Sequence, residues 1–432
     1  MATDNEAVMR QALMFHQRGD RVRAGELYRR IIRRDPRHAG ACHFYGLLLH
    51  QQGDNAAALV HMERALRSGA PSAAFYANTG SVYEAEWRLT EAAACYRRAL
   101  HLAPAMPEAL LGAGVVAQKQ GDYPAAEQYY RRAVAAAPPA AAVQAHWNLA
   151  LLLLLTGRYD EGWREYEWRL QGKSNLRGWA PTVEEIRGPG RSAVLINEMG
   201  FGDIIQFIRF LPQLRRCWPE IDCKYVCPPP LTRLFLDSFD AELMVAEENL
   251  ASSGATAIPM MSVPHLLRLQ PEMISGAAYL RAGLRATRSW GRKIAVDAGA
   301  GRLKVGLVWA GSPTHVNDRV RSLDPELLRD VLAVPEATFF SLQRGMKPEA
   351  AIPVPKAETV VDYGCRIDNF ADLAAIMVNL DVVVSVDTAA LHLAGALGVK
   401  AYGLIHFSPD LRWELAGEQT RWYDTVTLLR QE

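Results

Sequence analysis

The chain has 432 residues, of which 50% are hydrophobic and 22% are charged, and its formal net charge is +1. This length predicts two to four folding units, and the composition excludes a disordered chain. The near-neutral charge argues against nucleic acid or an anionic membrane as the main partner. We interpret the local basic cluster of Arg29, Arg30, Arg33 and Arg34 as a solvated helix face.

The beginning of the chain gives no targeting signal. Residues 1–11, MATDNEAVMRQ, lack the apolar core of a signal peptide, and the longest apolar run, Leu149 to Leu155, is too short to cross a membrane. The six cysteines form no CxxC pair, and Cys223 and Cys227 lack zinc-finger partners, so we expect reduced thiols and no metal. These features predict a cytoplasmic protein without a membrane span.

Small residues recur at a fixed interval in the first 170 residues. Ala12, Gly46, Gly80 and Gly114 are separated by 34 residues each, the period of the tetratricopeptide repeat, TPR. Further positions keep the same phase, namely Ala24, Ala58, Ala92 and Ala126, and Tyr28, Met62, Tyr96 and Tyr130. Small residues let the two helices of a hairpin approach closely, and the aromatic side chains fill the gap to the next hairpin. The pattern predicts about five TPR hairpins over residues 1–172.

Glycine and proline mark the ends of the predicted helices. Trp87 replaces the turn glycine of the third repeat, so we expect a different turn there. A stack of such hairpins has a long concave groove, which typically binds a protein or peptide. The alternative is a rigid spacer, or an arm through which the chain forms homo-oligomers.

Glycine and proline residues between Lys173 and Pro189 predict a linker or the entrance to the next unit. After it, short apolar runs alternate with helical stretches, which is typical of βαβ units. The first lobe, residues 173–300, is predicted to contain strands at 192–197, 223–227 and 243–246 and helices at 204–216 and 274–284. The second lobe, residues 301–432, is predicted to contain strands at 304–309, 338–342, 359–362, 382–386 and 401–405. Its helices are expected at 325–332, at 369–379 and after Asp387. The fold class is therefore an N-terminal α-solenoid followed by two Rossmann-like α/β lobes.

Ligands of open α/β sheets bind beyond the carboxyl ends of the strands, so the loops there are candidate sites. After the strand at 382–386, Asp387, Thr388, Ala389 and Ala390 lead into a helix whose free amides favour a phosphate. His392, one turn later, could reach the phosphate or a ribose. The alternative is that Asp387 or Thr388 is an ordinary N-cap and His392 packs on the sheet.

A second loop follows the first strand. Gly200 and Gly202 would let a ligand approach the backbone, and Asp203 at the helix start could remove a proton from an incoming hydroxyl. Asp203 could equally be a simple N-cap. A third loop, from Gly311 to Ser322, is rich in polar residues, and Ser312 and Arg321 suit phosphates or sugar hydroxyls. Its alternative is an exposed loop in which Ser322 caps the next helix.

Residues Ser192 to Gln431 resemble the heptosyltransferase-like glycosyltransferases, which have the two-lobed GT-B fold. The matching segments are GFGDIIQFIRFLPQL, KVGLVWAGSP, RSLDPELLRDVL, FFSLQRG and VVVSVDTAALHLAGALG. With the preceding GRYDEGWREYEWR (Gly157–Arg169), the chain looks like bacterial proteins that fuse TPRs to such a unit. This architecture is similar in logic to TPR-bearing protein O-glycosyltransferases.

The resemblance implies a role for each matched position. Asp203 would be the general base of an inverting, metal-independent transfer, and Gly200 and Gly202 would form its loop. The donor, a nucleotide sugar, would be bound by Asp387, Thr388, Ala389, Ala390, His392, Arg321, Gln343 and Ser312. Two positions depart from the family pattern, because Phe201 is bulky and Ala389 replaces the commoner glycine. No cofactor is implied.

An acceptor protein recruited by the TPR groove is favoured over a lipid, because no amphipathic or membrane-binding stretch is evident. The resemblance implies flagellin as one example. Two alternatives are a non-catalytic TPR scaffold with a degenerate transferase domain and a transferase that acts on glycan or lipid.

Overall fold

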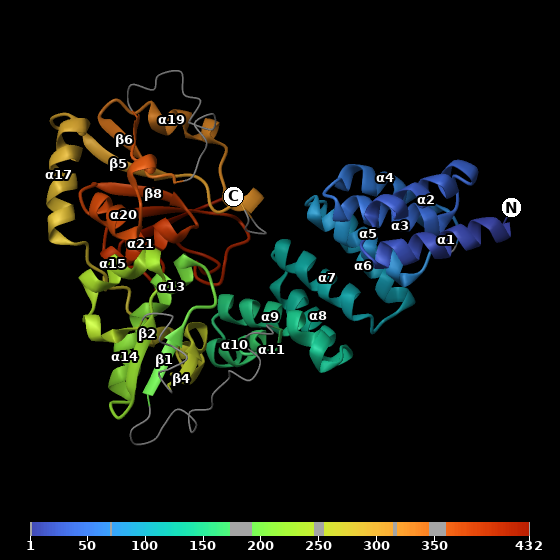
Figure 1. The fold of residues 1–432 in the computed structure, drawn as a ribbon, viewed down its shortest axis with the longest axis horizontal. Coiled ribbons are helices and arrows are strands. Elements are labelled where there is room, and N and C mark those ends of the chain that lie inside the picture. The colour runs from blue at the N-terminus through green and yellow to red at the C-terminus, as the bar shows by residue number, and fades with distance from the viewer. Residues whose placement is uncertain are drawn as a thin grey trace. The chain divides into compact units, whose positions relative to one another are not determined.

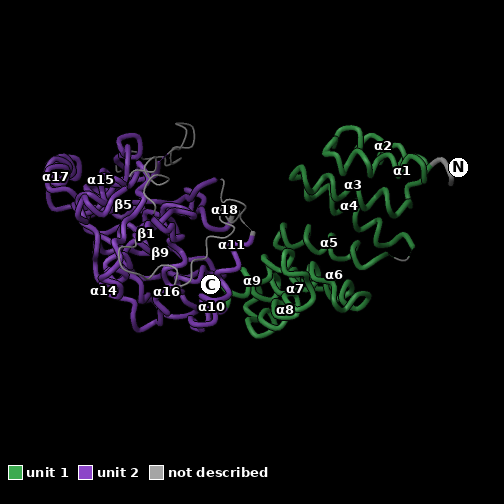
Figure 2. Tube along the Cα trace, turned by 60° about the horizontal axis from the view of Figure 1, so that its bottom comes forward, with its two compact units in different colours: residues 1–152 green, residues 153–432 purple. Residues whose placement is uncertain are grey.

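The computed structural model describes residues 2–69, 71–172, 192–245, 255–313, 318–344 and 360–431. The predicted linker at 173–189 and residues 314–317 of the third loop lie outside these ranges. The chain divides into two compact units, residues 1–152 and 153–432 (Figure 2). The division lies inside a helix, earlier in the chain than the boundary predicted at residue 172.

The first unit consists of antiparallel helical pairs, as the repeat pattern predicts (Figure 1). Its helices are α1 (Ala2–Gln17), α2 (Arg21–Arg34), α3 (Ala39–Gln51), α4 (Asn55–Arg67), α5 (Ala73–Ala85), α6 (Leu89–Leu102), α7 (Pro107–Lys119) and α8 (Tyr123–Ala136). Helix α9 (Pro139–Leu155) continues across the division. No helix in the described ranges is long and apolar enough to cross a membrane.

Side chains lock the hairpins together at the small residues. A Cβ added at Gly114 would lie 2.5 Å from the Tyr130 ring of the same hairpin. Tyr96 contacts two glycines, because a Cβ at Gly80 would lie 3.0 Å from its ring and one at Gly112, in the next hairpin, 2.2 Å. The tyrosine therefore fills the space between hairpins, which confirms the reason for the predicted pattern.

The turn at Trp87 is not different, and that expectation is wrong. Trp87 has a φ of 59°, in the left-handed region also occupied by the turn glycines Gly53 and Gly121. The following residue, Arg88, donates its N–H to Tyr83 O at 2.9 Å. Asp54 and Asp122 make the equivalent hydrogen bond in their own turns, each to the carbonyl of the residue five positions earlier. The hydrogen bonds that end the first helix set this conformation, and the indole ring lies beneath Lys119 Nζ at 4.6 Å.

The second unit begins with helical elements and a four-stranded parallel sheet. Helices α10 (Tyr159–Tyr166) and α11 (Arg169–Gly172) precede the strands β1 (Ser192–Ile196), β2 (Asp222–Val226), β3 (Met244–Val245) and β4 (Thr256–Pro259). The strand order is β3-β2-β1-β4. The helices of this part are α13 (Phe201–Phe207), α14 (Leu211–Cys217), α15 (Pro229–Ser238) and α16 (Val263–Leu266).

A six-stranded parallel sheet follows. Its strands are β5 (Leu303–Val308), β6 (Ala337–Ser341), β7 (Val360–Asp362), β8 (Val382–Val386), β9 (Ala401–Ile405) and β10 (Val426–Arg430), in the order β10-β9-β8-β5-β6-β7. Counted from β5 this is the doubly wound order 3-2-1-4-5-6, read from the other edge. Its helices are α17 (Leu284–Ala298), α18 (Asp318–Arg321), α19 (Arg329–Leu332), α20 (Phe370–Met377) and α21 (Ala389–Leu397).

Several predicted elements of this unit are wrong. Residues 274–284 do not form a helix, because the segment is held by hydrogen bonds from the N–H groups of Tyr279 and Leu280 to Ala396 O. The helix comes later, as α17. Strands β4 and β10 were not predicted, so 401–405 is not the last strand. The helix predicted at 204–216 begins earlier, at Phe201, and a 3-10 turn at Ile208–Phe210 interrupts it before α14.

Candidate functional site

The three candidate loops occupy corresponding places in the two sheets of the second unit. In the six-stranded sheet, β5 and β8 are neighbours whose continuations run toward opposite edges, so the loops after them lie at the topological switch point. In the four-stranded sheet, β1 lies between β2 and β4 and its loop holds the same position. Open α/β sheets bind ligands at this point. Both sheets therefore present a candidate loop at the place where a ligand is expected.

The turn after β8 leaves the start of α21 without a side-chain cap. Thr388 is the N-cap residue, but its hydroxyl lies 3.2 Å from Ser385 Oγ and makes no cap hydrogen bond. Thr388 therefore occupies the N-cap position, as the alternative interpretation has it, but its side chain does not cap the helix, and Asp387 is not the N-cap. Ala389 is the first helical residue and Ala390 is buried behind it. The first amides of α21 are those that favour an anion.

Asp387 is held by an arginine from the third loop. Arg321 donates from Nη2 to the Asp387 carbonyl, and its Nε lies 3.8 Å from Asp387 Oδ2. Burial raises the pKa of the Asp387 carboxyl, and the positive charge of Arg321 opposes that rise. The predicted neighbours Arg321 and Asp387 are thus together, with the guanidinium supporting the turn itself.

The loop after β1 places Asp203 in the first turn of α13. Gly200 is the N-cap, and its N–H donates to Asp203 Oδ2 at 3.1 Å. Asp203 is therefore the third helical residue and not the N-cap, so the alternative that we gave for Asp203 is wrong. Its other oxygen, Oδ1, accepts a hydrogen bond from Arg412.

These two loops meet although they belong to different sheets. A Cβ added at Gly202 would lie 3.0 Å from His392 Cδ2 and 3.5 Å from Ala389 Cα. Figure 1 shows α13 and α21 side by side between the two sheets. Phe201, bulky for this loop, is accommodated against Phe370 of α20, with ring centroids 5.3 Å apart. Glycine at 202 is what allows the two turns to touch.

His392 is buried beneath this contact. Its Nδ1 lies 2.9 Å from Tyr423 Oη, its ring stacks on Trp413 with centroids 5.2 Å apart, and its Nε2 is 4.0 Å from Asp387 Oδ1. Burial lowers the pKa of His392 well below its usual value, and the charge of Arg412 lowers it further. A neutral imidazole fixed by Tyr423 is therefore expected at neutral pH.

The third loop is tied to the same region. Gly311 donates its N–H to Ser322 Oγ at 2.9 Å, and a Cβ added to it would lie 3.7 Å from Thr388 Cγ2. Ser322 donates to Asp318 and is not the cap of the next helix, a role that Asp324 fills. Ser312 is exposed next to Gly311. Gln343 Oε1 accepts the Ala310 N–H at 3.0 Å, which directs its carbonyl toward the end of β5.

Arg412 is the residue that sequence reasoning missed. It lies between β9 and β10, and its guanidinium contacts Asp203, Gln206 and Asp410. The signal available in the sequence was an irregular stretch, rich in arginine and tryptophan, at the carboxyl end of a buried strand. Such a stretch is where polar ligand contacts are expected.

A buried ion-pair cluster joins α11 to Glu198, which precedes Gly200 in the loop after β1. Arg169 donates from Nε and Nη2 to the Glu198 carboxylate at 3.0 and 2.6 Å, and from Nη1 to Glu167 at 2.6 Å. Ser262 bridges Arg169 and Glu167 at 2.8 Å each. The side chains of Arg169 and Glu198 are only 2% and 1% exposed. The cluster fixes the chain immediately ahead of Gly200.

Helix α10 also packs against α13. Trp163 lies edge-on to Phe207 at 5.9 Å, and burial raises the pKa of Tyr166, with the charge of Asp203 contributing. The last helices of the repeat pattern are thus part of the second unit. In the described ranges, no group of three or more His, Cys, Asp and Glu side chains could hold a metal ion.

Comparisons with known proteins identify the helical part. The profile of the tetratricopeptide repeat family matches residues 45–107, 88–141 and 111–167, which confirms the TPR prediction. The chain is 25% identical over 309 residues to Protein FlbA of Caulobacter vibrioides, covering 64% of this chain and 50% of FlbA. It therefore spans about half the length of that curated relative.

Solved structures of TPR proteins are similar to part of the chain. YrrB, described as a TPR protein with an unusual peptide-binding site, is 16% identical and covers 40% of this chain and 85% of its own, with a TM-score of 0.34. TTC0263, a thermophilic TPR protein in Thermus thermophilus, is 21% identical. The match covers 40% of this chain and 95% of the TTC0263 chain, with a TM-score of 0.34.

Proposed function

We propose that this protein binds a protein partner through its repeat array and serves as an interaction scaffold. The match of residues 45–167 to the TPR family is the observation that supports this function best. TPR stacks bury their faces only against neighbouring repeats and leave an extended surface for a partner.

The charges of the first unit indicate the chemistry of that partner. Residues 1–152 contain 17 lysines and arginines against 13 aspartates and glutamates, a net charge of +4. The polar residues of the first helices of the hairpins are paired across successive repeats: His16 with Gln51, His43 with Asn78, and Glu84 with Lys119. Of these three contacts, the one between Glu84 and Lys119 is an ion pair.

The second helices carry a row of arginines in register. Arg30, Arg64, Arg98 and Arg132 are 34 residues apart, so each occupies the same place in its hairpin. In the described residues none of the four pairs with a carboxylate; Arg64 contacts Cys42 Sγ and Arg132 donates to Pro104 O. Because this row has no counter-charge in the part of the chain that the structure describes, we propose that it faces an acidic segment of the partner.

Binding of fluorescent acidic peptides, measured by anisotropy at low and high salt, tests this proposal. The triple variant R30Q/R98Q/R132Q should bind about ten-fold more weakly, with a smaller salt dependence. The matched control is R67Q/R131Q, because these two arginines already pair with Glu63 and Glu127. Equal affinity of the triple variant and this control would refute the assignment of the arginine row.

A second candidate function is glycosyl transfer by a GT-B unit. The observation that favours it is the contact of Gly202 with Ala389 and His392, which joins the switch points of two parallel sheets. The uncapped start of α21, with Arg321 beside it, suits the diphosphate of a nucleotide sugar.

In this reaction Asp203 takes the proton of the acceptor hydroxyl, whose oxygen forms a bond to the anomeric carbon of the sugar. The bond from that carbon to the nucleoside diphosphate breaks, and the electron pair leaves with the diphosphate. The α21 amides and Arg321 would stabilise the leaving group without a metal. Gln343 and Ser312 would lie near the same ligand, from the loops after β6 and β5.

Release of nucleoside diphosphate from a panel of UDP-, GDP- and dTDP-sugars tests the second candidate. Flagellin, a glycan and a lipid should be compared as acceptors, because the acceptor class separates a protein transferase from the glycan or lipid alternative. D203N should lower release about a thousand-fold, to a residual rate, and retain nucleotide binding; normal turnover by D203N would remove Asp203 as the base. Absence of release from every donor would leave the scaffold function alone.

A further inference from the structure

Arg412 links the two sheets of the second unit through one guanidinium. Its Nε donates to Gln206 Oε1 at 2.5 Å, its Nη1 to Asp410 Oδ1 at 2.5 Å, and its Nη2 to Asp203 Oδ1. Asp203 and Gln206 belong to α13, which follows β1 of the four-stranded sheet, whereas Arg412 follows β9 of the six-stranded sheet. The contact therefore joins residues more than 200 positions apart.

Asp203 is held on both of its oxygens. Oδ2 accepts the Gly200 N–H at 3.1 Å and Oδ1 accepts from Arg412. An ionised carboxylate has about four lone-pair sites, so these two bonds leave room for an acceptor hydroxyl. The bonds restrict the rotation of the carboxylate, and rotation is what a proton acceptor must avoid to stay aligned with its substrate.

Arg412 also acts on the turn after β8. The arginine side chain is 11% exposed, and the carboxylates of Asp410 and Asp203 outweigh its desolvation and raise its pKa, so it stays charged. Burial raises the pKa of Asp387 and lowers that of His392; the charge of Arg412 opposes the rise at Asp387 and adds to the lowering at His392. A single cation thus influences both loops that meet at Gly202.

Stability alone is a poor explanation for such a group. A buried ion pair seldom stabilises a protein more than well-packed apolar residues would, because its desolvation cost is large. Gln206 is completely buried, and its side-chain oxygen accepts a hydrogen bond from this same arginine. Three polar side chains, one of them the candidate base Asp203, are arranged around one guanidinium.

We propose that Arg412 is a positioning residue of the transfer reaction, which holds the Asp203 carboxylate toward the start of α21. This inference rests on the second candidate function. Arg412 acts through Asp203 and not through direct contact with the nucleotide, so its loss should lower the rate of the chemical step and leave nucleotide affinity intact.

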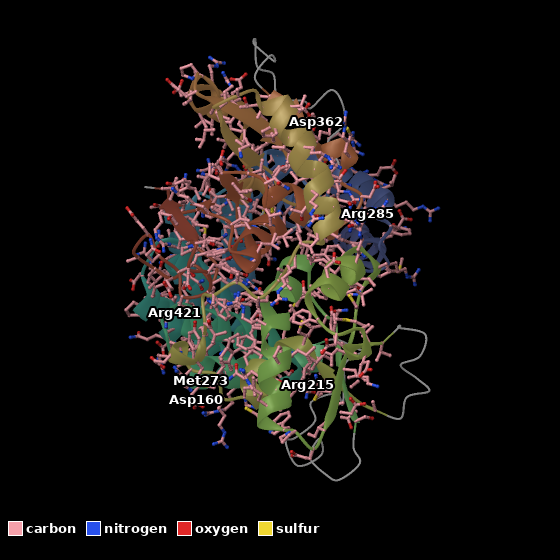
Figure 3. The ribbon with its side chains drawn as sticks, turned by 90° about the vertical axis from the view of Figure 1, so that its left-hand side faces the viewer. Asp160, Arg215, Met273, Arg285, Asp362 and Arg421 are labelled. Carbon is pink, nitrogen blue, oxygen red and sulfur yellow. The ribbon has the colours of Figure 1, made fainter. Side chains whose placement is uncertain are left out.

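The experiment compares R412Q, R412K, D203N and R412Q/D203N with the wild-type chain. Nucleoside diphosphate release gives kcat and KM for the donor, and calorimetry with UDP, GDP and dTDP gives the affinity. The matched control is R421Q, because Arg421 lies on the same segment but pairs with Glu414 and is 39% exposed; Figure 3 labels it. Melting temperatures show whether each variant folds.

We expect R412Q to lower kcat by about a hundred-fold, with nucleotide affinity within about two-fold of wild type. The double variant should be no slower than D203N, since the arginine has nothing left to position. R412K keeps the positive charge and should recover part of the rate. If R412Q does not fold, the kcat and nucleotide affinity of R412K are compared with those of wild type instead. R421Q should match wild type.

Three results would overturn the inference: wild-type kcat in R412Q, an R412Q loss that adds to that of D203N, or an affinity that falls as much as kcat. Absence of release by the wild-type chain is a separate result, since it removes the transferase function and this inference with it.

Discussion

Replacing Arg169 with methionine removes the centre of the buried ion-pair cluster. The Glu198 carboxylate, 1% exposed, would lose both of its bonds from Arg169, and Glu167 would lose one. Removing one partner of a buried pair typically costs about 3–5 kcal/mol, because the remaining charge is desolvated and uncompensated. We expect a loss of this size in the stability of the second unit.

Hydrogen exchange measured by mass spectrometry reports this loss locally. A cost of about 3 kcal/mol corresponds to exchange roughly a hundred-fold faster wherever the cluster supports the fold. The peptides to follow are those that cover β1 and α13, on either side of Glu198. R169M/E198Q should recover much of the protection, because the buried carboxylate is then neutral.

The matched control is R158M. Arg158 pairs with Glu161 at the surface, with 45% of its side chain exposed, so its loss should cost less than about 1 kcal/mol. If R169M and R158M change the exchange of β1 and α13 equally little, the cluster does not hold the loop ahead of Gly200, and the argument is refuted.

The remaining predictions concern packing and pH. Gly114→Ala should destabilise the first unit by about 1–3 kcal/mol, because the new Cβ would lie 2.5 Å from Tyr130, and thermal melting of residues 1–152 within the full chain measures this. Burial lowers the pKa of His43 to about 4 from 6.5, so the native state binds fewer protons than the unfolded state in this range. Stability of the first unit should therefore be full above pH 6.5 and fall by about 3 kcal/mol as the pH drops toward 4, which urea denaturation at several pH values checks; His43→Gln should flatten the curve. Gly395→Ala should displace Tyr423, whose ring would lie 2.3 Å from the added Cβ, and weaken the packing around His392; an unchanged near-UV circular dichroism spectrum would contradict this.

The helical unit could be predicted because its signal is periodic. Residues such as Gly80 and Tyr96 recur with the repeat, so the pattern and the packing have the same cause. The turn at Trp87 could not be predicted from residue type, since hydrogen bonds along the preceding helix impose its left-handed conformation. Periodicity gives the arrangement of helices but not the conformation of a residue that departs from its usual type.

The second unit was predictable where strands are short, apolar and buried, as at Val382–Val386. It was not predictable where tertiary contacts decide. The segment around Tyr279 has a helical pattern, yet its amides bond to α21. The same holds for the site: Asp203 and Asp387 follow strands and could be named, whereas Arg412 reaches Asp203 from 209 residues away. Local patterns carry no information about such a contact.

The division of the chain inside α9 has a practical consequence for anyone who recombines these parts. A TPR array and an α/β unit look like separable domains, and a chimera joined at residue 172 would seem natural. Such a cut would strip Trp163 from Phe207 and separate Glu198 from the arginine that neutralises it in the interior. The junction for exchanging repeats must therefore lie upstream of α10, so that α10 and α11 stay with the unit against which their side chains pack.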